Sequence, residues 1–141
     1  MVDLHITVRP TRSGDVAALS AIERAAAGRF RDIPEFAWLA DGEVITAEQH
    51  LDYAERGFSW LALANDRPVG FILTEAHASS LFIVELSVDR AWQGKGIGRQ
   101  LIACAADHAR KMGLTALTLT TFREVPWNAP FYARLGFEKM T

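Results

Sequence analysis

Cysteine is almost absent from the sequence, which contains only Cys104. No disulfide can therefore form within the chain. Cys104 stands in an alanine-rich helical stretch, where it is expected as a small buried apolar residue rather than a reactive thiol. The four histidines, at positions 5, 50, 77 and 108, are scattered without the spacing of metal ligands, so no metal site is expected.

The chain also has no surplus of positive charge, since 15 lysines and arginines stand against 17 aspartates and glutamates. A net charge of −2 argues against general nucleic-acid binding, although it leaves room for a local basic patch around an anionic cofactor. No apolar stretch reaches the roughly 20 residues that cross a bilayer. A signal peptide has a basic region followed by an apolar run, and the N-terminus shows no such pattern. These absences predict a soluble, cytoplasmic protein with no nucleic-acid or membrane partner.

What the sequence does contain is a large apolar fraction, because 50% of its 141 residues are hydrophobic. A chain of this size and composition is expected to form one domain, residues 1–141, whose core needs no disulfide or structural metal. Period-two patterns and apolar runs predict strands over residues 5–9, 58–64, 69–75, 80–88 and 114–121. Helical spacing predicts helices over residues 16–26, 47–56, 97–112 and 128–135.

The order of these elements predicts an α/β fold built on a mixed, mostly antiparallel sheet with helices on both faces. A tight turn at residues 65–68 joins two strands into a hairpin. Residues 80–121 form a parallel strand–helix–strand unit. The helix within it has a predicted apolar stripe of Ile97, Leu101, Ala105, Ala109 and Met112.

Residues 93–98, with the sequence QGKGIG, lie between a buried strand and an amphipathic helix. Their three glycines keep the turn sterically open, so successive backbone N–H groups can point into one concavity. The helix N-terminus adds unpaired donors and a partial positive charge. Lys95 and Arg99 add charge at the rim. The segment therefore predicts an anion site suited to a phosphate or pyrophosphate. The alternative is a glycine-rich turn without a ligand.

The spacing of these glycines disfavours the two commonest nucleotide sites. It lacks the four residues between Gly and Gly-Lys that an ATP-type P-loop requires. It also fails the dinucleotide fingerprint, because the third glycine comes one residue early and no acidic residue ends the next strand. A nucleotide-dependent oxidoreductase is therefore the weakest of the functions considered.

Two separated motifs resemble the GNAT superfamily of N-acetyltransferases. Gln93, Gly96 and Gly98 match its Gln-x-x-Gly-x-Gly hallmark, and residues 85–89 (ELSVD) before them resemble its fourth strand. Residues 128–137 (NAPFYARLGF) resemble its later signature of Asn followed by Phe-Tyr and Gly-Phe. The resemblance covers about residues 58–138, and the first 57 residues match only in outline.

The resemblance implies a GNAT-like acyl-CoA N-acyltransferase fold with acetyl-CoA as cofactor. It assigns cofactor contacts to three groups of residues: Leu86, Ser87 and Val88 for the pantetheine arm and acetyl carbonyl; Gln93, Gly94, Lys95, Gly96, Ile97, Gly98 and Arg99 for the pyrophosphate; and Asn128 and Phe131 for the remaining contacts. The reaction it implies is direct attack of an amine on the thioester, which makes the chain a transferase of the acyltransferase class.

The amine must lose a proton before it attacks, which costs roughly 4–5 kcal/mol at pH 7 for a lysine-type amine. Glu85 is the leading candidate base, because it is the carboxylate inside an apolar run and burial raises a carboxylate's pKa. A structural pairing with an arginine or backbone N–H groups is the alternative. Glu75 and Glu124 are fallback bases. Tyr132 matches the family's general acid, which protonates the departing thiolate; the alternative is an aromatic core residue.

Aromatic residues are the candidates for the acceptor pocket, because ring faces attract cationic amines. They are Phe30, Phe36, Trp38 and Trp127, which could instead simply pack a lid over the domain. The acceptor is expected to be a primary amine of a small molecule, protein or peptide. The alternative function is a non-catalytic acyl-CoA-binding or regulatory module on the same fold.

One departure from the family concerns the C-terminal strand, which is expected to be short or missing because the sequence stops at Thr141. Either this strand is absent, or a partner chain supplies an equivalent, or the sequence is a truncated version. The sheet edge left exposed is a candidate homodimer interface.

Overall fold

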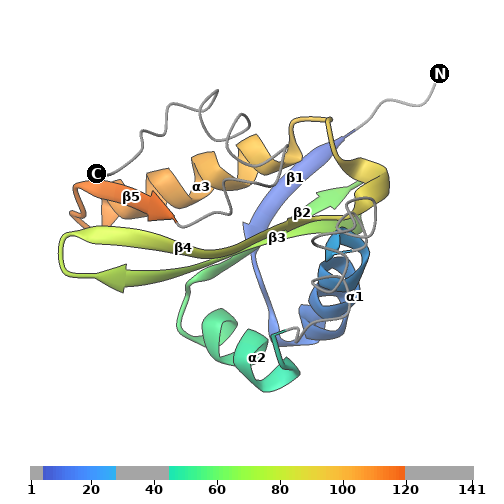
Figure 1. Ribbon diagram of the computed structural model, residues 1–141, viewed down its shortest axis with the longest axis horizontal. Coiled ribbons are helices and arrows are strands. Elements are labelled where there is room, and N and C mark those ends of the chain that lie inside the picture. The colour runs from blue at the N-terminus through green and yellow to red at the C-terminus, as the bar shows by residue number, and fades with distance from the viewer. Residues whose placement is uncertain (1–4, 28–44, 120–141) are drawn as a thin grey trace, which may run out of the picture.

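A five-stranded mixed sheet forms the centre of the computed structural model, which describes residues 5–27 and 45–119 (Figure 1). The strands are β1 (Ile6–Pro10), β2 (Ser59–Ala64), β3 (Arg67–His77), β4 (Ser80–Val88) and β5 (Ala116–Leu119). They lie in the order β1-β2-β3-β4-β5. The first three pairings are antiparallel, and β4 pairs with β5 in parallel. The predicted mixed, mostly antiparallel sheet is confirmed.

Helices cover both faces of this sheet (Figure 1). The helices α1 (Val16–Ala27) and α2 (Ala47–Glu55) lie on one face, and α3 (Ile97–Lys111) lies on the other. Two 3-10 turns, η1 (Ser13–Asp15) and η4 (Arg90–Trp92), lead into α1 and toward α3. These positions confirm the three predicted helices within the described ranges. The helix predicted over residues 128–135 and the end of the strand predicted over 114–121 lie outside them, as does the C-terminal edge proposed for a dimer.

The core consists of two apolar layers, one on each face of the sheet, because strand residues alternate between the faces. Strand residues such as Trp60, Ile72 and Leu81 pack on the α3 side, and Leu61, Phe71 and Leu73 pack on the α1 side. From the helices, Leu101 and Leu19 are fully buried. Each such side chain contributes about 1.5–3 kcal/mol through burial, so the two layers hold the sheet rigidly between its helices.

The β2–β3 turn is tighter than the predicted span of residues 65–68. Ala64 pairs with Arg67, so only Asn65 and Asp66 lie between the strands. Both have positive φ, at 48° and 68°, which a two-residue type I′ hairpin requires and which Asn and Asp tolerate. Arg67 and Pro68 therefore belong to β3.

The end of α3 also differs from the prediction. Met112 is 42% exposed, so its place in the apolar stripe was wrong. The helix ends at Lys111, and Met112 is its C-cap rather than part of its buried face. None of the helices in the described ranges combines the length and the apolar character needed to cross a membrane.

Candidate active site

A β-bulge in β4 determines where the side chain of Glu85 lies. Leu73 of β3 pairs with Glu85 and the next residue, Thr74, pairs with Ile83, so Val84 is the extra residue. Ile83 packs in the α3-side layer, whereas Val84 packs against the layer on the α1 side. Strict alternation would send Glu85 to the same face as Ile83. The bulge instead turns Glu85 toward α1 and α2.

Glu85 is partly buried, and two groups of the described chain donate hydrogen bonds to its carboxylate. The hydroxyl of Ser87 donates to its Oε1 at 3.1 Å, and the backbone N–H of Leu86 also stabilises its charge. Burial raises the pKa of Glu85 to about 7, and the nearby carboxylate of Glu23 adds to this increase. The two hydrogen bonds and His50 act in the opposite direction. A carboxyl group with a pKa near neutrality can exchange a proton at physiological pH.

Glu85 directly precedes the three residues of β4, 86–88, that were predicted to contact the cofactor's pantetheine arm. Ser87 is 5% exposed and shares the face of Glu85, while Leu86 and Val88 pack toward α3. In the described part of the chain, β5 pairs only with residues 80–83 of β4. The candidate base and the predicted arm-binding residues are therefore consecutive on one strand.

The loop after β4 has the open backbone expected for an anion site. Gly94 and Gly96 have φ of 79° and 83°, in the left-handed region that favours glycine, and Gly96 is the N-cap of α3. Among the described residues, no hydrogen bond uses the backbone N–H groups of residues 94–99. The first such bond of the helix runs from the N–H of Gln100 to the carbonyl of Gly96 at 3.2 Å. A row of donors that are unpaired within the described residues thus lies at the start of α3.

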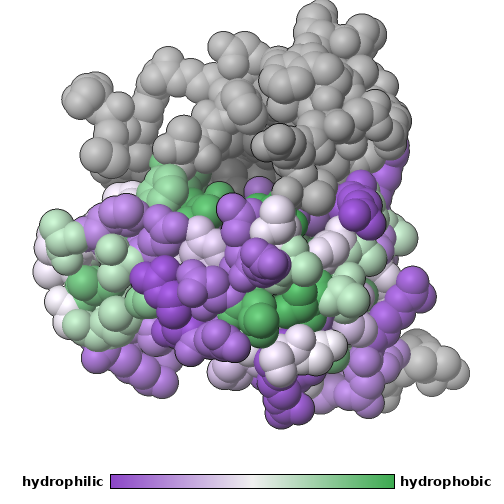
Figure 2. All heavy atoms as spheres, turned by 90° about the horizontal axis from the view of Figure 1, so that it is seen from below, coloured by the Kyte–Doolittle hydropathy of each residue, from purple (hydrophilic) through white to green (hydrophobic). Residues whose placement is uncertain are grey.

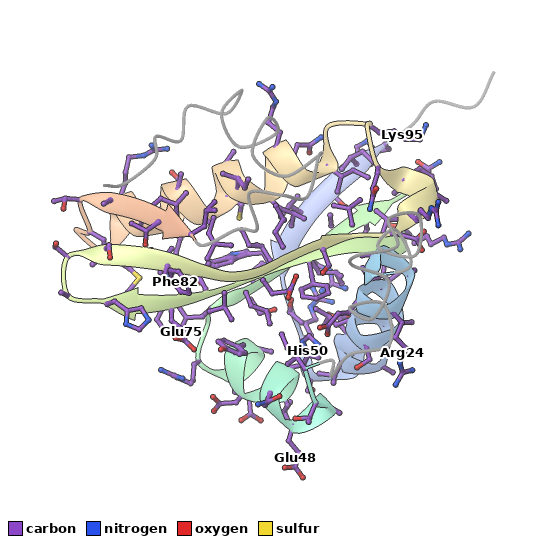
Figure 3. The ribbon with its side chains drawn as sticks, in the orientation of Figure 1. Arg24, Glu48, His50, Glu75, Phe82 and Lys95 are labelled. Atoms are coloured by element: carbon purple, nitrogen blue, oxygen red, sulfur yellow. The ribbon has the colours of Figure 1, made fainter. Side chains whose placement is uncertain are left out.

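Side chains around this loop fix its position and add positive charge. Nε2 of Gln93 donates to the carbonyl of Val88 at 3.0 Å, which ties the loop to the end of β4. Asp89 caps η4 by accepting from the N–H of Ala91 at 3.0 Å. Lys95 and Arg99 are exposed beside the unpaired donors. Figure 3 shows Lys95 at the end of the molecule where β4 leads into α3.

Gly70 of β3 lets α3 lie close to the sheet at this point. A Cβ on Gly70 would stand 3.1 Å from the carbonyl oxygen of Ser87 and 3.3 Å from Cγ2 of Ile97. It would also approach the side chain of Leu101 to 3.4 Å. The missing side chain therefore sets the distance between the β4 backbone and the first turn of α3.

Glu75, one of the fallback bases, lies in a different environment. Its carboxylate accepts hydrogen bonds from the hydroxyl of Tyr53 and the ring of His77. The bond from Tyr53, more than any other contact, lowers the pKa of Glu75, and burial raises the pKa of Tyr53 to about 12. A carboxylate stabilised in this way is a weak base, so Glu85 is the better candidate of the two.

Glu75 belongs to a shallow polar pocket of about 530 Å³ on the outer side of α2. The pocket is lined by Thr46, Glu48, Gln49, Asp52, Tyr53, Arg56 and Glu75. Figure 2 looks at the molecule from this side and shows hydrophilic side chains across its described surface, with apolar ones between them.

A buried pair that the sequence analysis did not single out lies behind Glu85. Oε1 of Glu23, on α1, is 3.3 Å from Nε2 of His50, on α2. Glu23 is 9% exposed and His50 is fully buried. Figure 3 shows His50 on α2 beneath the sheet. Its burial could not be foreseen, because the positions around His50 in α2 carry mostly polar residues.

Comparison with known proteins identifies the family of this chain. The model of the acetyltransferase (GNAT) family matches residues 21–137. The chain belongs to the GNAT family. The match includes β4, the loop at residues 93–98 and the later motif, so the family predicted from two short motifs is confirmed.

Two curated relatives show how far the likeness in sequence extends. The N-acetyltransferase YvbK of Bacillus subtilis is 30% identical over 87 residues, or 61% of this chain and 56% of that protein. A mycothiol acetyltransferase of Renibacterium salmoninarum is 29% identical over 133 residues, or 89% of this chain and 38% of that protein. The matches to curated relatives thus span about half of their length or less.

A solved structure shows the same fold over nearly the whole chain. The PaiA N-acetyltransferase of Thermoplasma acidophilum, in complex with coenzyme A, matches with a TM-score of 0.83 at 20% identity. The match covers 95% of this chain and 90% of that one. The predicted GNAT-like fold is confirmed.

Several residues predicted from the GNAT resemblance lie outside the described ranges. They are the general acid Tyr132, the cofactor contacts Asn128 and Phe131, the fallback base Glu124, and the acceptor aromatics Phe30, Phe36, Trp38 and Trp127. Among the residues that are described, no group of three or more His, Cys, Asp or Glu side chains could hold a metal ion. Cys104 is half-buried against the α3-side layer, and burial raises the pKa of its thiol, as befits a packing residue.

Proposed function

We propose that this GNAT protein is an acetyl-CoA-dependent N-acetyltransferase that acts on a primary amine by direct attack. One observation carries the proposal: β4 presents a carboxyl group with a pKa of about 7 at Glu85 and runs into a loop in which, among the described residues, the backbone N–H groups of residues 94–99 are unpaired. A base and an anion site on one continuous segment suit a thioester cofactor that carries a pyrophosphate. The complex of the PaiA relative with coenzyme A supports the same cofactor.

The cofactor is proposed to lie along β4 and across the start of α3. The N–H groups of residues 94–98 would bind the pyrophosphate with Arg99 and Lys95, because the helix N-terminus adds a partial positive charge there, and Gln93 would hold the loop to the end of β4. Leu86, Ser87 and Val88 would line the pantetheine arm. Gly94 and Gly96 give the loop the left-handed backbone that this arrangement needs.

Glu85 is proposed as the general base. A carboxylate accepts a proton from the ammonium form of the acceptor, and the neutral amine then attacks the acetyl carbonyl. Near neutral pH a group with a pKa of about 7 is partly ionised yet basic enough to take the proton. Tyr132 is proposed to donate the proton to the departing thiolate, with Asn128 and Phe131 as further cofactor contacts. These three assignments follow from the GNAT motif.

The acceptor is proposed to be a primary amine of a small molecule or a peptide, bound near Phe30, Phe36, Trp38 and Trp127. Their aromatic faces would attract its cationic form.

Calorimetry with acetyl-CoA and with NAD tests the cofactor. The proposal predicts saturable binding of acetyl-CoA and none of NAD, and the opposite result would overturn it. Calorimetry does not separate an enzyme from a non-catalytic acyl-CoA-binding module, because both bind the cofactor. Release of free thiol in the presence of an amine makes that distinction.

A further inference from the structure

We propose that Glu23 and His50 form a buried positioning pair that sets the proton affinity of Glu85. In this arrangement Glu23 holds a fixed negative charge near the base, and His50 holds Glu23 in place. The inference rests on the proposed function in one respect, since it takes Glu85 as the base of the reaction. The coupling between the three side chains can be measured without any turnover.

The carboxylate of Glu23 is held from two sides. The backbone N–H of Ile45 donates to both of its oxygens, at 3.2 and 3.3 Å. Nε2 of His50 lies 3.3 Å from Oε1. Since Glu23 is only 9% exposed, solvent screens its charge weakly. A carboxylate fixed in this way acts on its neighbours more strongly than one at the surface.

Burial of the polar ring of His50 costs free energy. His50 is fully buried, its ring meets Phe71 edge-on at 5.2 Å, and its Nδ1 has no hydrogen-bond partner among the described residues. A buried polar atom without a partner costs about 1–3 kcal/mol. An apolar residue at this position would avoid that cost, so the ring is retained for its contact with Glu23.

The β4 bulge brings Glu85 to the same face as this pair. Within residues 5–27 and 45–119, the groups that act on its carboxylate are Glu23 from α1, His50 from α2, and the Ser87 hydroxyl and Leu86 N–H from β4 itself. From β3 the paired residue is Leu73, which is apolar. Glu23 is therefore the one negative charge among these neighbours, and it favours the protonated form of Glu85.

This arrangement makes proton uptake by Glu85 more favourable. When the acceptor ammonium reaches the site, its N–H bond breaks, an O–H bond forms on Glu85, and the electron pair stays on the amine nitrogen. The reaction turns a cation and an anion into a neutral amine and a neutral acid. Because uptake of the proton also relieves the repulsion from Glu23, Glu23 strengthens Glu85 as a base, and His50 limits this effect.

The test is a ¹³C NMR titration of the Glu85 carboxyl group in the ligand-free full chain, with the resonance assigned by its loss in Glu85→Gln. Glu23→Gln removes the negative charge and keeps an oxygen that can accept from Ile45. It should therefore move the Glu85 midpoint to lower pH. His50→Gln keeps a donor for Glu23 but removes the ring, which itself lowers the pKa of Glu85, so it should move the midpoint to higher pH. Glu75→Gln, a carboxylate on the same sheet face but bonded to Tyr53, should leave the midpoint in place.

The outcomes separate this inference from the proposed function. An unchanged Glu85 midpoint in both Glu23→Gln and His50→Gln would overturn the pair, even if the protein acetylates amines. Should Glu23→Gln fail to fold, His50→Gln decides: a shift of the Glu85 midpoint to higher pH upholds the inference, and an unchanged midpoint overturns it. Shifts of the predicted sign together with no thiol release would uphold the pair and reject the enzymatic role. In an active enzyme, the acid limb of the kcat/KM profile should move with the NMR midpoint.

Discussion

The hydroxyl of Ser87 donates to Oε1 of Glu85 across 3.1 Å, so the candidate base is held by the next residue but one on its own strand. This bond favours the charged form of Glu85 and opposes the effect of burial on its pKa. Ser87→Ala should therefore raise the Glu85 pKa further above 7 and move the acid limb of the kcat/KM profile to higher pH. Ser80→Ala removes a hydroxyl that bonds to His77 at the other end of β4 and should leave the limb in place. If the acid limb does not move in Ser87→Ala, Glu85 is not the group whose ionisation determines that limb.

Gly96→Ala should weaken acetyl-CoA binding through the backbone rather than through a clash. No atom lies within 4 Å of a Cβ built on Gly96, but its φ of 83° costs an L-residue about 1–2 kcal/mol. Relief of that strain would turn the N–H groups of the loop away from the pyrophosphate. Calorimetry should show roughly tenfold weaker binding for each 1.4 kcal/mol lost.

Gly57→Ala is the matched control for this prediction. Gly57 has a φ of 80° and equally open surroundings, but it follows α2 far from the loop. It should lose similar stability and keep its affinity for acetyl-CoA. Equal loss of affinity in both variants would show that the effect of Gly96→Ala comes from general destabilisation.

Gly70→Ala should destabilise the fold by pushing α3 away from the sheet. The new methyl group would stand 3.1 Å from the Ser87 carbonyl oxygen, which is backbone and cannot yield as a side-chain end can. Overpacking of this kind costs about 1–3 kcal/mol. Urea denaturation should report this loss, whereas Gly14→Ala, with no atom within 4 Å of its Cβ, should stay near the wild-type value. A Gly70→Ala variant as stable as wild type would contradict the close approach.

Glu85 should make stability depend on pH in a defined direction. Its pKa rises from 4.5 to about 7 on folding, so between these values the folded state binds more protons than the unfolded one. The free energy of unfolding therefore falls as pH increases across this window, by at most about 3 kcal/mol. Glu85→Gln removes the charge, so its stability relative to wild type should increase between pH 5 and pH 8. Denaturation curves at the two pH values measure this, and a constant difference would contradict the raised pKa.

The sequence predicted the fold and the open backbone of the glycine-rich loop well, because both depend on local patterns. Alternation and helical periodicity located β4 at residues 80–88 and α3 from Ile97, and the glycines marked the positive φ at positions 94 and 96. Local patterns could not predict on which face of the sheet the side chain of Glu85 lies. A single extra residue, Val84, reverses the alternation, and nothing in an unbroken apolar run marks where a bulge falls.

Contacts between segments that are far apart in the chain could not be predicted from the sequence either. Glu23 and His50 are 27 residues apart and meet only because α1 and α2 share one face of the sheet. Each is polar within an amphipathic segment, where exposure is the ordinary expectation. The same holds for Gly70, whose role depends on how closely α3 approaches β3.

The most direct test of N-acetyl transfer is free-thiol release from acetyl-CoA across a panel of primary amines, with wild type and Glu85→Gln compared from pH 6 to pH 10. The account predicts amine-dependent thiol release matched by acetylated amine in mass spectrometry. It also predicts a deficit in Glu85→Gln that narrows as pH rises, because the free amine then forms without a base. Saturable acetyl-CoA binding without amine-dependent thiol release at any pH would contradict the account and leave a non-catalytic acyl-CoA-binding module.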